Sequence, residues 1–75
     1  MTITEALPLG AMSPLEFARR SKGHSQVSLG EAALVHPNTI ALVESGGNVP
    51  GRLTRARIAR ALDVDESMLF DESAR

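Results

Sequence analysis

Closely spaced start and stop signals for helices divide this chain and limit it to short helices. In the segment MSPLEF, Ser13 can cap a helix, Pro14 suits its first position, and Glu16 can reach back to complete a capping box. Gly23 then favours a stop, so we expect a first helix from Pro14 to about Lys22. Helices this short are marginal alone and depend on packing against one another.

The second expected helix carries a glycine on its inward side. Ser25 can cap a helix that runs from Gln26 to about Leu34. Its inward positions are Leu29, Ala33 and, as a further candidate, Val27. Gly30 costs about 1 kcal/mol relative to alanine within a helix. We therefore expect another helix backbone to cross very close to Gly30.

The third expected helix, Pro37–Ser45, has clear ends and an unusual outward face. Ile40 and Val43 face inward at helical spacing, and Gly46 can terminate the helix. The remaining side chains mix small polar and apolar types. Such a mixture is strange for a plain solvated surface.

Two further helices are expected after the loop GGNVPGR. Thr54 is a plausible cap for a fourth helix that ends at about Leu62, and Gly51 is a rival start. Asp65 can cap a short fifth helix that extends through Phe70. The sequence thus predicts five helices.

The composition supports this all-α prediction and excludes several classes of protein. The 75 residues include two Phe and no Trp, Tyr or Cys, so the core must be mainly aliphatic, which suits packed helices. The absence of cysteine excludes a disulfide framework and thiolate metal sites. No apolar run approaches the length of a membrane span, so we expect a soluble, cytoplasmic protein. No cofactor is expected.

One domain is expected at residues 13–70. Residues 1–12 show no clear period and contain Pro8 and Gly10, so we interpret them as an arm whose order the sequence leaves open. Residues 71–75 form a short acidic tail.

Charge is segregated along the chain, although the net charge is only −1. Residues 13–62 hold seven Lys/Arg and three Asp/Glu, whereas residues 63–75 hold five acids and one arginine. The middle of the chain therefore carries the positive charge that a nucleic-acid partner requires.

Two short helices joined by a short turn, with a small residue at their crossing, describe a helix-turn-helix. Residues 15–70 resemble the lambda-repressor-like, or Cro/XRE, family of DNA-binding domains. The resemblance rests on four pieces of sequence: RRSKGHSQ, TIALVESG, Pro50 after Glu44, and IARALDV ahead of LF. It implies a compact five-helix domain that acts as a sequence-specific transcriptional regulator. It also implies a homodimer on double-stranded DNA, with half-sites arranged as an inverted repeat.

The resemblance places the third helix in the major groove of DNA. The implied base contacts come from His36, Pro37, Asn38, Thr39, Ala41 and Leu42. Asn can pair with adenine through two hydrogen bonds, and Ala, Thr and Leu can contact thymine methyl groups. We therefore expect a half-site rich in A·T pairs. His36 has a plainer interpretation as the helix cap alone.

Further roles follow from the same resemblance. The implied phosphate contacts are Gln26, Ser45, Gly47, Asn48, Arg52 and Arg55. A structural ion pair is implied between Arg19 and Glu44, which ties the first helix to the end of the third. The residues themselves, rather than the resemblance, indicate a dimer surface at Met68, Leu69 and Phe70, which provide more apolar area than a short last helix can bury. As an alternative, Gln26 and the arginines belong to solvated faces, and Arg19 and Glu44 are unpaired surface charges.

The chain departs from the family pattern at three positions. Leu34 stands where the turn often has Gly, and Arg55 stands where an apolar residue is usual. The third helix has neither Arg nor Gln, and Leu42 is apolar on its outward face. These departures leave open an alternative function: a protein-interaction module, such as an antitoxin, antirepressor or adaptor, with the same fold.

Catalysis and metal binding are not expected. The sequence shows no nucleophile with a neighbouring base, no paired inward carboxylates and no recognisable phosphate loop. Neither His24 nor His36 has a second ligand at metal-binding spacing. The chain is therefore not predicted to be an enzyme.

Overall fold

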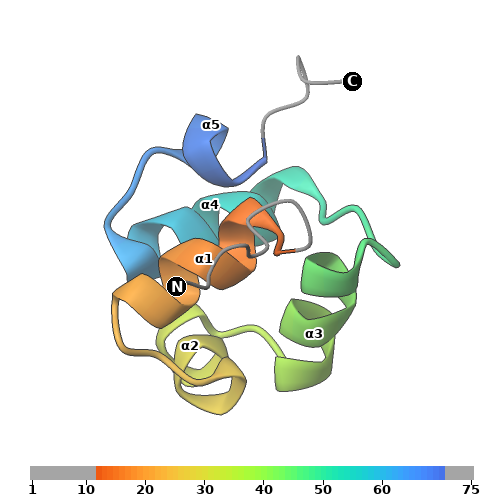
Figure 1. The fold of residues 1–75 in the computed structure, drawn as a ribbon. Helices are drawn as coiled ribbons and strands as arrows, with labels where there is room; N and C mark the ends of the chain where they lie inside the picture. The colour runs from red at the N-terminus through yellow and green to blue at the C-terminus, as the bar shows by residue number, and fades with distance from the viewer. Residues whose placement is uncertain (1–11, 71–75) are drawn as a thin grey trace, which may run out of the picture.

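The computed structural model describes residues 12–70 and contains five α-helices there, with no strand in that range (Figure 1). They are α1 (Pro14–Ser21), α2 (Gln26–Ala33), α3 (Pro37–Ser45), α4 (Arg52–Leu62) and α5 (Glu66–Leu69). The predicted five-helix, all-α fold is confirmed. The predicted tail and all but the last residue of the predicted arm lie outside the described residues.

The N-terminus of α1 forms at the predicted cap. The Glu16 backbone N–H donates to Ser13 Oγ over 3.1 Å, and Pro14 takes the first helical position. The Glu16 carboxylate pairs with Arg20 Nη2 at 2.6 Å, one turn further along the helix. Gly23 follows the helix with a φ of +81°, a conformation that glycine adopts without strain.

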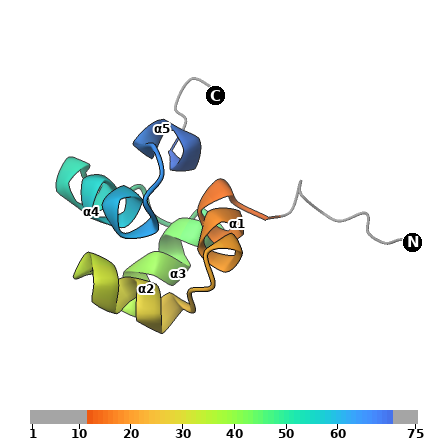
Figure 2. The same ribbon diagram turned by 90° about the vertical axis from the view of Figure 1, so that its left-hand side faces the viewer.

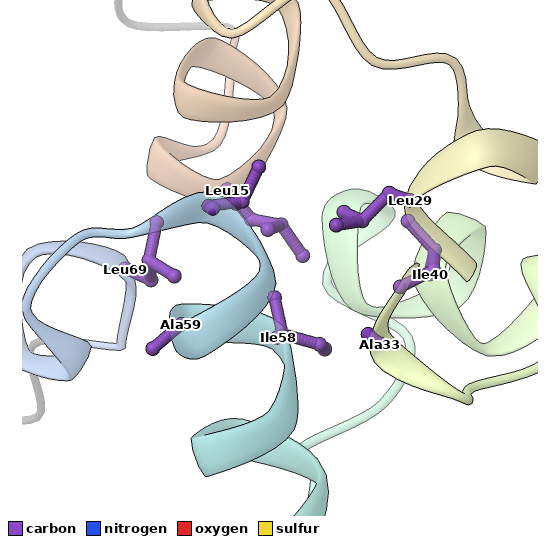
Figure 3. Packing of buried hydrophobic residues seen from close by; sticks show 8 residues of the cluster. Leu15, Leu29, Ala33, Ile40, Ile58, Ala59 and Leu69 are labelled. Atoms are coloured by element: carbon purple, nitrogen blue, oxygen red, sulfur yellow. The ribbon is translucent and has the colours of Figure 1, made fainter. Parts of the chain in front are cut away.

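A single aliphatic core lies between the helices (Figure 3). Every helix contributes to it, and the buried side chains are Leu15, Leu29, Ala33, Ile40, Ile58, Ala59, Leu62 and Leu69. Val27, the further candidate for an inward position, is exposed instead. The physical reason is that Val27 lies about 200° around the helix axis from Leu29, and so on the opposite face of α2.

The inward glycine of α2 permits a close backbone approach. A Cβ atom added at Gly30 would lie 2.5 Å from the carbonyl oxygen of Val35 and 3.3 Å from the nitrogen of Pro37. The expected close approach is therefore present. The neighbouring backbone is the turn after α2 and the first residue of α3, rather than the middle of a crossing helix.

The fourth helix starts earlier than the cap that the sequence favours, Thr54. Gly51 is the N-cap, and its carbonyl oxygen accepts the Arg55 N–H at 3.0 Å. The predicted cap, Thr54, is wrong because it lies inside the first turn of α4, and the rival start at Gly51 is the one adopted. Gly51 has no side chain to bond the helix end, so no capping side chain marks this start in the sequence.

The last helix begins as predicted and ends one residue early. The Asp65 carboxylate accepts the Ser67 N–H at 3.2 Å, and Phe70 is the C-cap rather than a helical residue. In both ribbon views, α5 lies at the end of the domain opposite α2 (Figures 1 and 2).

The turn after α2 contains backbone strain that a substitution can relieve. Leu34 is left-handed, with φ 60° and ψ 44°, and its side chain is 76% exposed. This conformation costs a residue with a Cβ about 1–2 kcal/mol, while glycine loses about 0.4–1 kcal/mol in backbone entropy. We expect Leu34→Gly to raise the free energy of unfolding by up to about 1 kcal/mol, as measured by urea denaturation.

Leu34→Ala is the matched control for this strain. It removes the exposed side chain but retains the Cβ, so it should bring no such gain in stability. Equal stability of the glycine and alanine variants would show that Leu34 is not strained.

Candidate nucleic-acid interface

The two central helices form a tight pair joined by a short turn. The N–H groups of Leu34 and Val35 both donate to the carbonyl oxygen of Gly30, the second at 2.9 Å. The chain therefore reverses directly at the end of α2, and His36 is already the cap of α3. The α2 helix packs against both α3 and α4, and α1 also contacts α3. The inner side of α3 is therefore fixed by its neighbours.

The α3 helix has one buried face and one accessible face. Ile40 is fully buried and Val43 packs against the core from its edge. On the other side, His36, Asn38 and Leu42 are exposed, and Leu42 retains 50% of its accessible surface. The remaining predicted base-contact residues, Pro37, Thr39 and Ala41, are partly exposed. All six residues are thus accessible on the described part of the chain.

His36 caps α3 through its ring. The backbone N–H of Asn38 donates to His36 Nδ1 over 3.0 Å. This bond occupies one ring nitrogen, so Nε2 is the nitrogen that the ring can direct outward. The cap interpretation of His36 is confirmed, and any contact with DNA would be an additional role.

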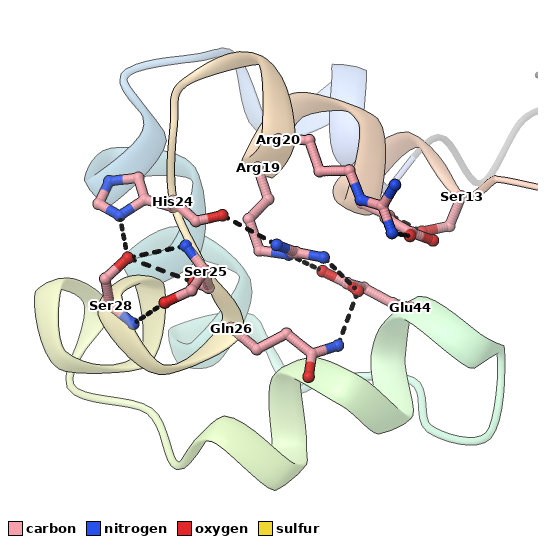
Figure 4. Close-up of polar contacts among 9 residues, drawn as sticks. Ser13, Arg19, Arg20, His24, Ser25, Gln26, Ser28 and Glu44 are labelled. Atoms are coloured by element: carbon pink, nitrogen blue, oxygen red, sulfur yellow. Dashed lines mark hydrogen bonds and ion pairs between the residues drawn. The ribbon is translucent and has the colours of Figure 1, made fainter.

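A buried polar network connects α3 to the helices that precede it (Figure 4). Arg19 Nε lies 2.5 Å from Glu44 Oε2, and Arg19 Nη2 lies 3.2 Å from Oε1. The two side chains are only 8% and 5% exposed. Arg19 Nη1 also donates to the carbonyl oxygen of His24 at 2.8 Å. The predicted ion pair therefore forms with two-point geometry and excludes the alternative of unpaired surface charges.

Gln26 belongs to the same network. Its Nε2 donates to Glu44 Oε1 at 3.0 Å, which joins the first residue of α2 to the end of α3. Gln26 is expected to contact phosphate, and no local pattern in the sequence signals this bond to a partner 18 residues away. Gln26 is partly exposed, so this residue lies near the surface while its amide donates to Glu44.

The residues after α3 present backbone rather than long side chains. Gly46 adopts a left-handed φ of 85°, and the Gly47 N–H donates to the Leu42 carbonyl oxygen at 2.8 Å. Ser45 Oγ donates to that same oxygen at 3.0 Å. Ser45, Gly47 and Asn48 are all exposed, which leaves this loop accessible to a ligand.

The two arginines predicted to contact phosphate have different surroundings. Arg52, the first residue of α4, is exposed. Arg55 is partly buried and lines an open hollow of about 890 Å³ between the start of α1, the α3–α4 loop and α5. The structure therefore places Arg52 on the surface near the loop and holds Arg55 against the hollow.

The structure also separates the residues predicted for a dimer surface. Leu69 is 5% exposed and belongs to the core, so it cannot supply exposed apolar area to a second copy. Met68 is 66% exposed, and Phe70 packs partly against the core. Both line the hollow, together with Val49 of the α3–α4 loop.

The described residues contain neither a metal-binding cluster nor a membrane-spanning helix. Between residues 12 and 70, no group of three or more His, Cys, Asp or Glu side chains is arranged to hold a metal ion. Within the same range, no helix is long and apolar enough to cross a membrane.

Comparison with known proteins identifies the arrangement of helices. Residues 15–69 match a family model described as helix-turn-helix, of the Cro/C1 type. The match begins at the second residue of α1 and ends at the last residue of α5, so it includes all five helices except the first residue of α1. No curated protein sequence matches the chain.

Proposed function

The chain belongs to the Cro/C1-type helix-turn-helix family of DNA-binding regulatory domains, and we propose that it regulates transcription by binding a specific DNA sequence through α3. The observation that supports this proposal is the division of α3 into two faces. Ile40 anchors the helix in the core, while Asn38 and Leu42 remain accessible. A helix held in this way can enter the major groove without rearrangement of the core.

Contacts with the phosphate groups of the DNA would orient the domain on the duplex. The exposed loop residues Ser45, Gly47 and Asn48 follow α3 directly, and Arg52 begins the next helix. Short side chains and backbone N–H groups can approach a phosphate closely, and Arg52 adds a charge. Gln26 lies at the start of α2, where helix N–H groups favour an anion. These groups would provide affinity that falls steeply with salt concentration.

Two substitutions separate sequence recognition from general affinity. We expect Asn38→Ala to lower the discrimination between the preferred site and altered sites by about 1–3 kcal/mol, because an adenine contact is lost. We expect Arg52→Ala to weaken binding evenly on all sequences and to lower the salt slope by about one unit. Both are measured by fluorescence anisotropy on DNA fragments selected from a random pool.

The control for Arg52→Ala is a basic residue outside the proposed interface. Arg20 is exposed on α1, on an element that the proposal does not place on DNA. Arg20→Ala should therefore change affinity less than Arg52→Ala does. Unchanged operator binding in both the Asn38 and the Arg52 variants would show that the proposed docking is wrong.

We propose that two copies bind together, on half-sites one helical turn apart in an inverted repeat. The net charge of −1 gives a single copy little general attraction to DNA. The apolar hollow beside α5 offers a surface for the second copy, with Met68 exposed at its rim and Phe70 in its wall. Exposed apolar area of this kind is typical of protein interfaces.

Met68→Asp tests this dimer surface. We expect it to shift the protein toward monomer in sedimentation velocity and to weaken binding to the two-half-site operator more than to a single half-site. The charge would be desolvated in the interface, whereas the exposed Met68 contributes little to the monomer core. An unaltered sedimentation profile would exclude α5 from the interface.

A second function is supported by the chemistry of α3 itself. Its exposed face includes Leu42 and has no Arg, Lys or Gln, so it also suits a protein partner. Salt dependence distinguishes the two functions. Binding to duplex DNA that weakens steeply with salt supports the regulator, whereas no DNA binding at low salt together with a stable protein complex supports an adaptor.

A further inference from the structure

We propose that Leu42 is a specificity-determining residue that reads the 5-methyl group of a pyrimidine in the major groove. On this proposal the protein distinguishes thymine from uracil, and 5-methylcytosine from cytosine. Its affinity for a site that contains cytosine at this position then depends on DNA methylation. This inference rests on the proposed function and assigns the base chemistry that α3 recognises.

Several polar groups of α3 and its cap are already bonded within the protein, so few remain to bond bases. His36 Nδ1 accepts the Asn38 N–H, and Ser45 Oγ donates to the Leu42 carbonyl oxygen. Glu44 is the only charged residue of α3, and its carboxylate is buried with Arg19. The commonest specific base contact, the two-point bond of arginine to guanine, has no donor on this helix. Asn38, Thr39 and the Nε2 atom of the cap residue His36 are the polar side-chain groups that remain at its N-terminal end.

Leu42 lies outside the hydrophobic core and is exposed. Ile40 and Val43 provide the contacts of α3 with the core, and Leu42 keeps half of its accessible surface. A Cβ atom added at Gly47 would lie 3.6 Å from Leu42 Cδ2, so the loop after α3 passes close to the Leu42 side chain and leaves it uncovered there. The bond from the Gly47 N–H to the Leu42 carbonyl oxygen holds this loop in place. Leu42 is thus an exposed apolar side chain on a helix that the core holds through Ile40.

The methyl group of thymine is the apolar feature that a base edge presents in the major groove. 5-Methylcytosine carries the same group on the same ring carbon, so an aliphatic side chain can contact either base. Burying one methyl group contributes about fourfold in affinity, the equivalent of about 0.8 kcal/mol. Uracil and unmethylated cytosine lack the group and cannot make this contact.

The first experiment replaces each thymine of a selected operator by deoxyuridine, one position at a time. For the natural sequence of the protein, we expect one position in each half-site at which this replacement weakens binding about fourfold. In Leu42→Ala the same replacement should have no effect at that position. In Leu42→Met, which keeps an apolar side chain, the deoxyuridine effect should largely return. Circular dichroism confirms that each variant keeps its helices.

Phe17→Leu is the matched control. Phe17 is an exposed apolar residue on α1, outside the proposed interface, so this variant should show the same fourfold loss as the unaltered protein. The second experiment places cytosine at the sensitive position, with and without a 5-methyl group. Methylation should raise affinity about fourfold for the unaltered protein and leave Leu42→Ala unchanged.

The outcomes separate this inference from the function on which it rests. If the random pool gives no enriched fragment at low salt, DNA binding itself fails and this inference fails with it. If fragments are enriched but no deoxyuridine replacement weakens binding, or if the loss is equal in Leu42→Ala, the methyl-reading role is overturned and DNA binding stands.

Discussion

Glu44→Ala is expected to lower the free energy of unfolding by about 3–5 kcal/mol, the largest effect of any substitution considered for this domain. The change removes both acceptors of the Arg19 guanidinium on Glu44 and leaves that charge buried beside the His24 carbonyl oxygen. It also removes the acceptor of the Gln26 amide. Urea denaturation followed by circular dichroism measures the loss.

The exposed ion pair of α1 provides the control for this prediction. Arg20 pairs with Glu16 at a similar distance, but its side chain is 60% exposed. Arg20→Ala should therefore cost only about 0.5 kcal/mol. A double change to apolar residues, Arg19→Met with Glu44→Leu, should recover much of the stability, because no buried charge is left. Similar losses in Glu44→Ala and Arg20→Ala would contradict the buried-charge argument.

Gly30→Ala is expected to lower the free energy of unfolding by about 3 kcal/mol. The new Cβ would lie 2.5 Å from the Val35 carbonyl oxygen, which is part of the backbone and cannot rotate away as a side chain can. The turn must open, and α3 must shift relative to α2. We therefore expect weaker DNA binding in addition to the loss of stability, measured on the same protein sample.

Gly47→Ala is the matched control for stability. A Cβ there would meet its nearest neighbour, Ser45 Oγ, at 3.5 Å, which is an ordinary contact. The stability should change by less than about 1 kcal/mol. If the two alanine variants have equal stability, the close approach at Gly30 does not constrain the turn.

The helices could be predicted well from the sequence where capping determines them. Ser13 and Pro14 start α1, and His36 and Pro37 start α3, at the predicted residues. The reason is that a cap depends on side chains and N–H groups within one turn of the chain. Where the cap has no side chain, as at Gly51, the sequence favoured Thr54 instead and was wrong.

The candidate site was predictable only in part. The pair of Arg19 with Glu44, 25 residues apart, was expected from the resemblance to a family and not from spacing. The accessible face of α3 followed from its period, because Ile40 and Val43 mark the inward side. The bond from Gln26 to Glu44 and the different surroundings of Arg52 and Arg55 were not expected.

The number of helices, most of their ends and the family can be read from the amino-acid sequence alone, since these depend on caps, helical period and short motifs. The folded domain was needed to show that Leu69 joins the core while Met68 stays exposed, and that Gln26 bonds Glu44. Those outcomes depend on which distant segments pack together. Contacts between distant segments form because apolar surface is buried across the whole core. A pattern within one short segment does not show which distant residues it will meet there.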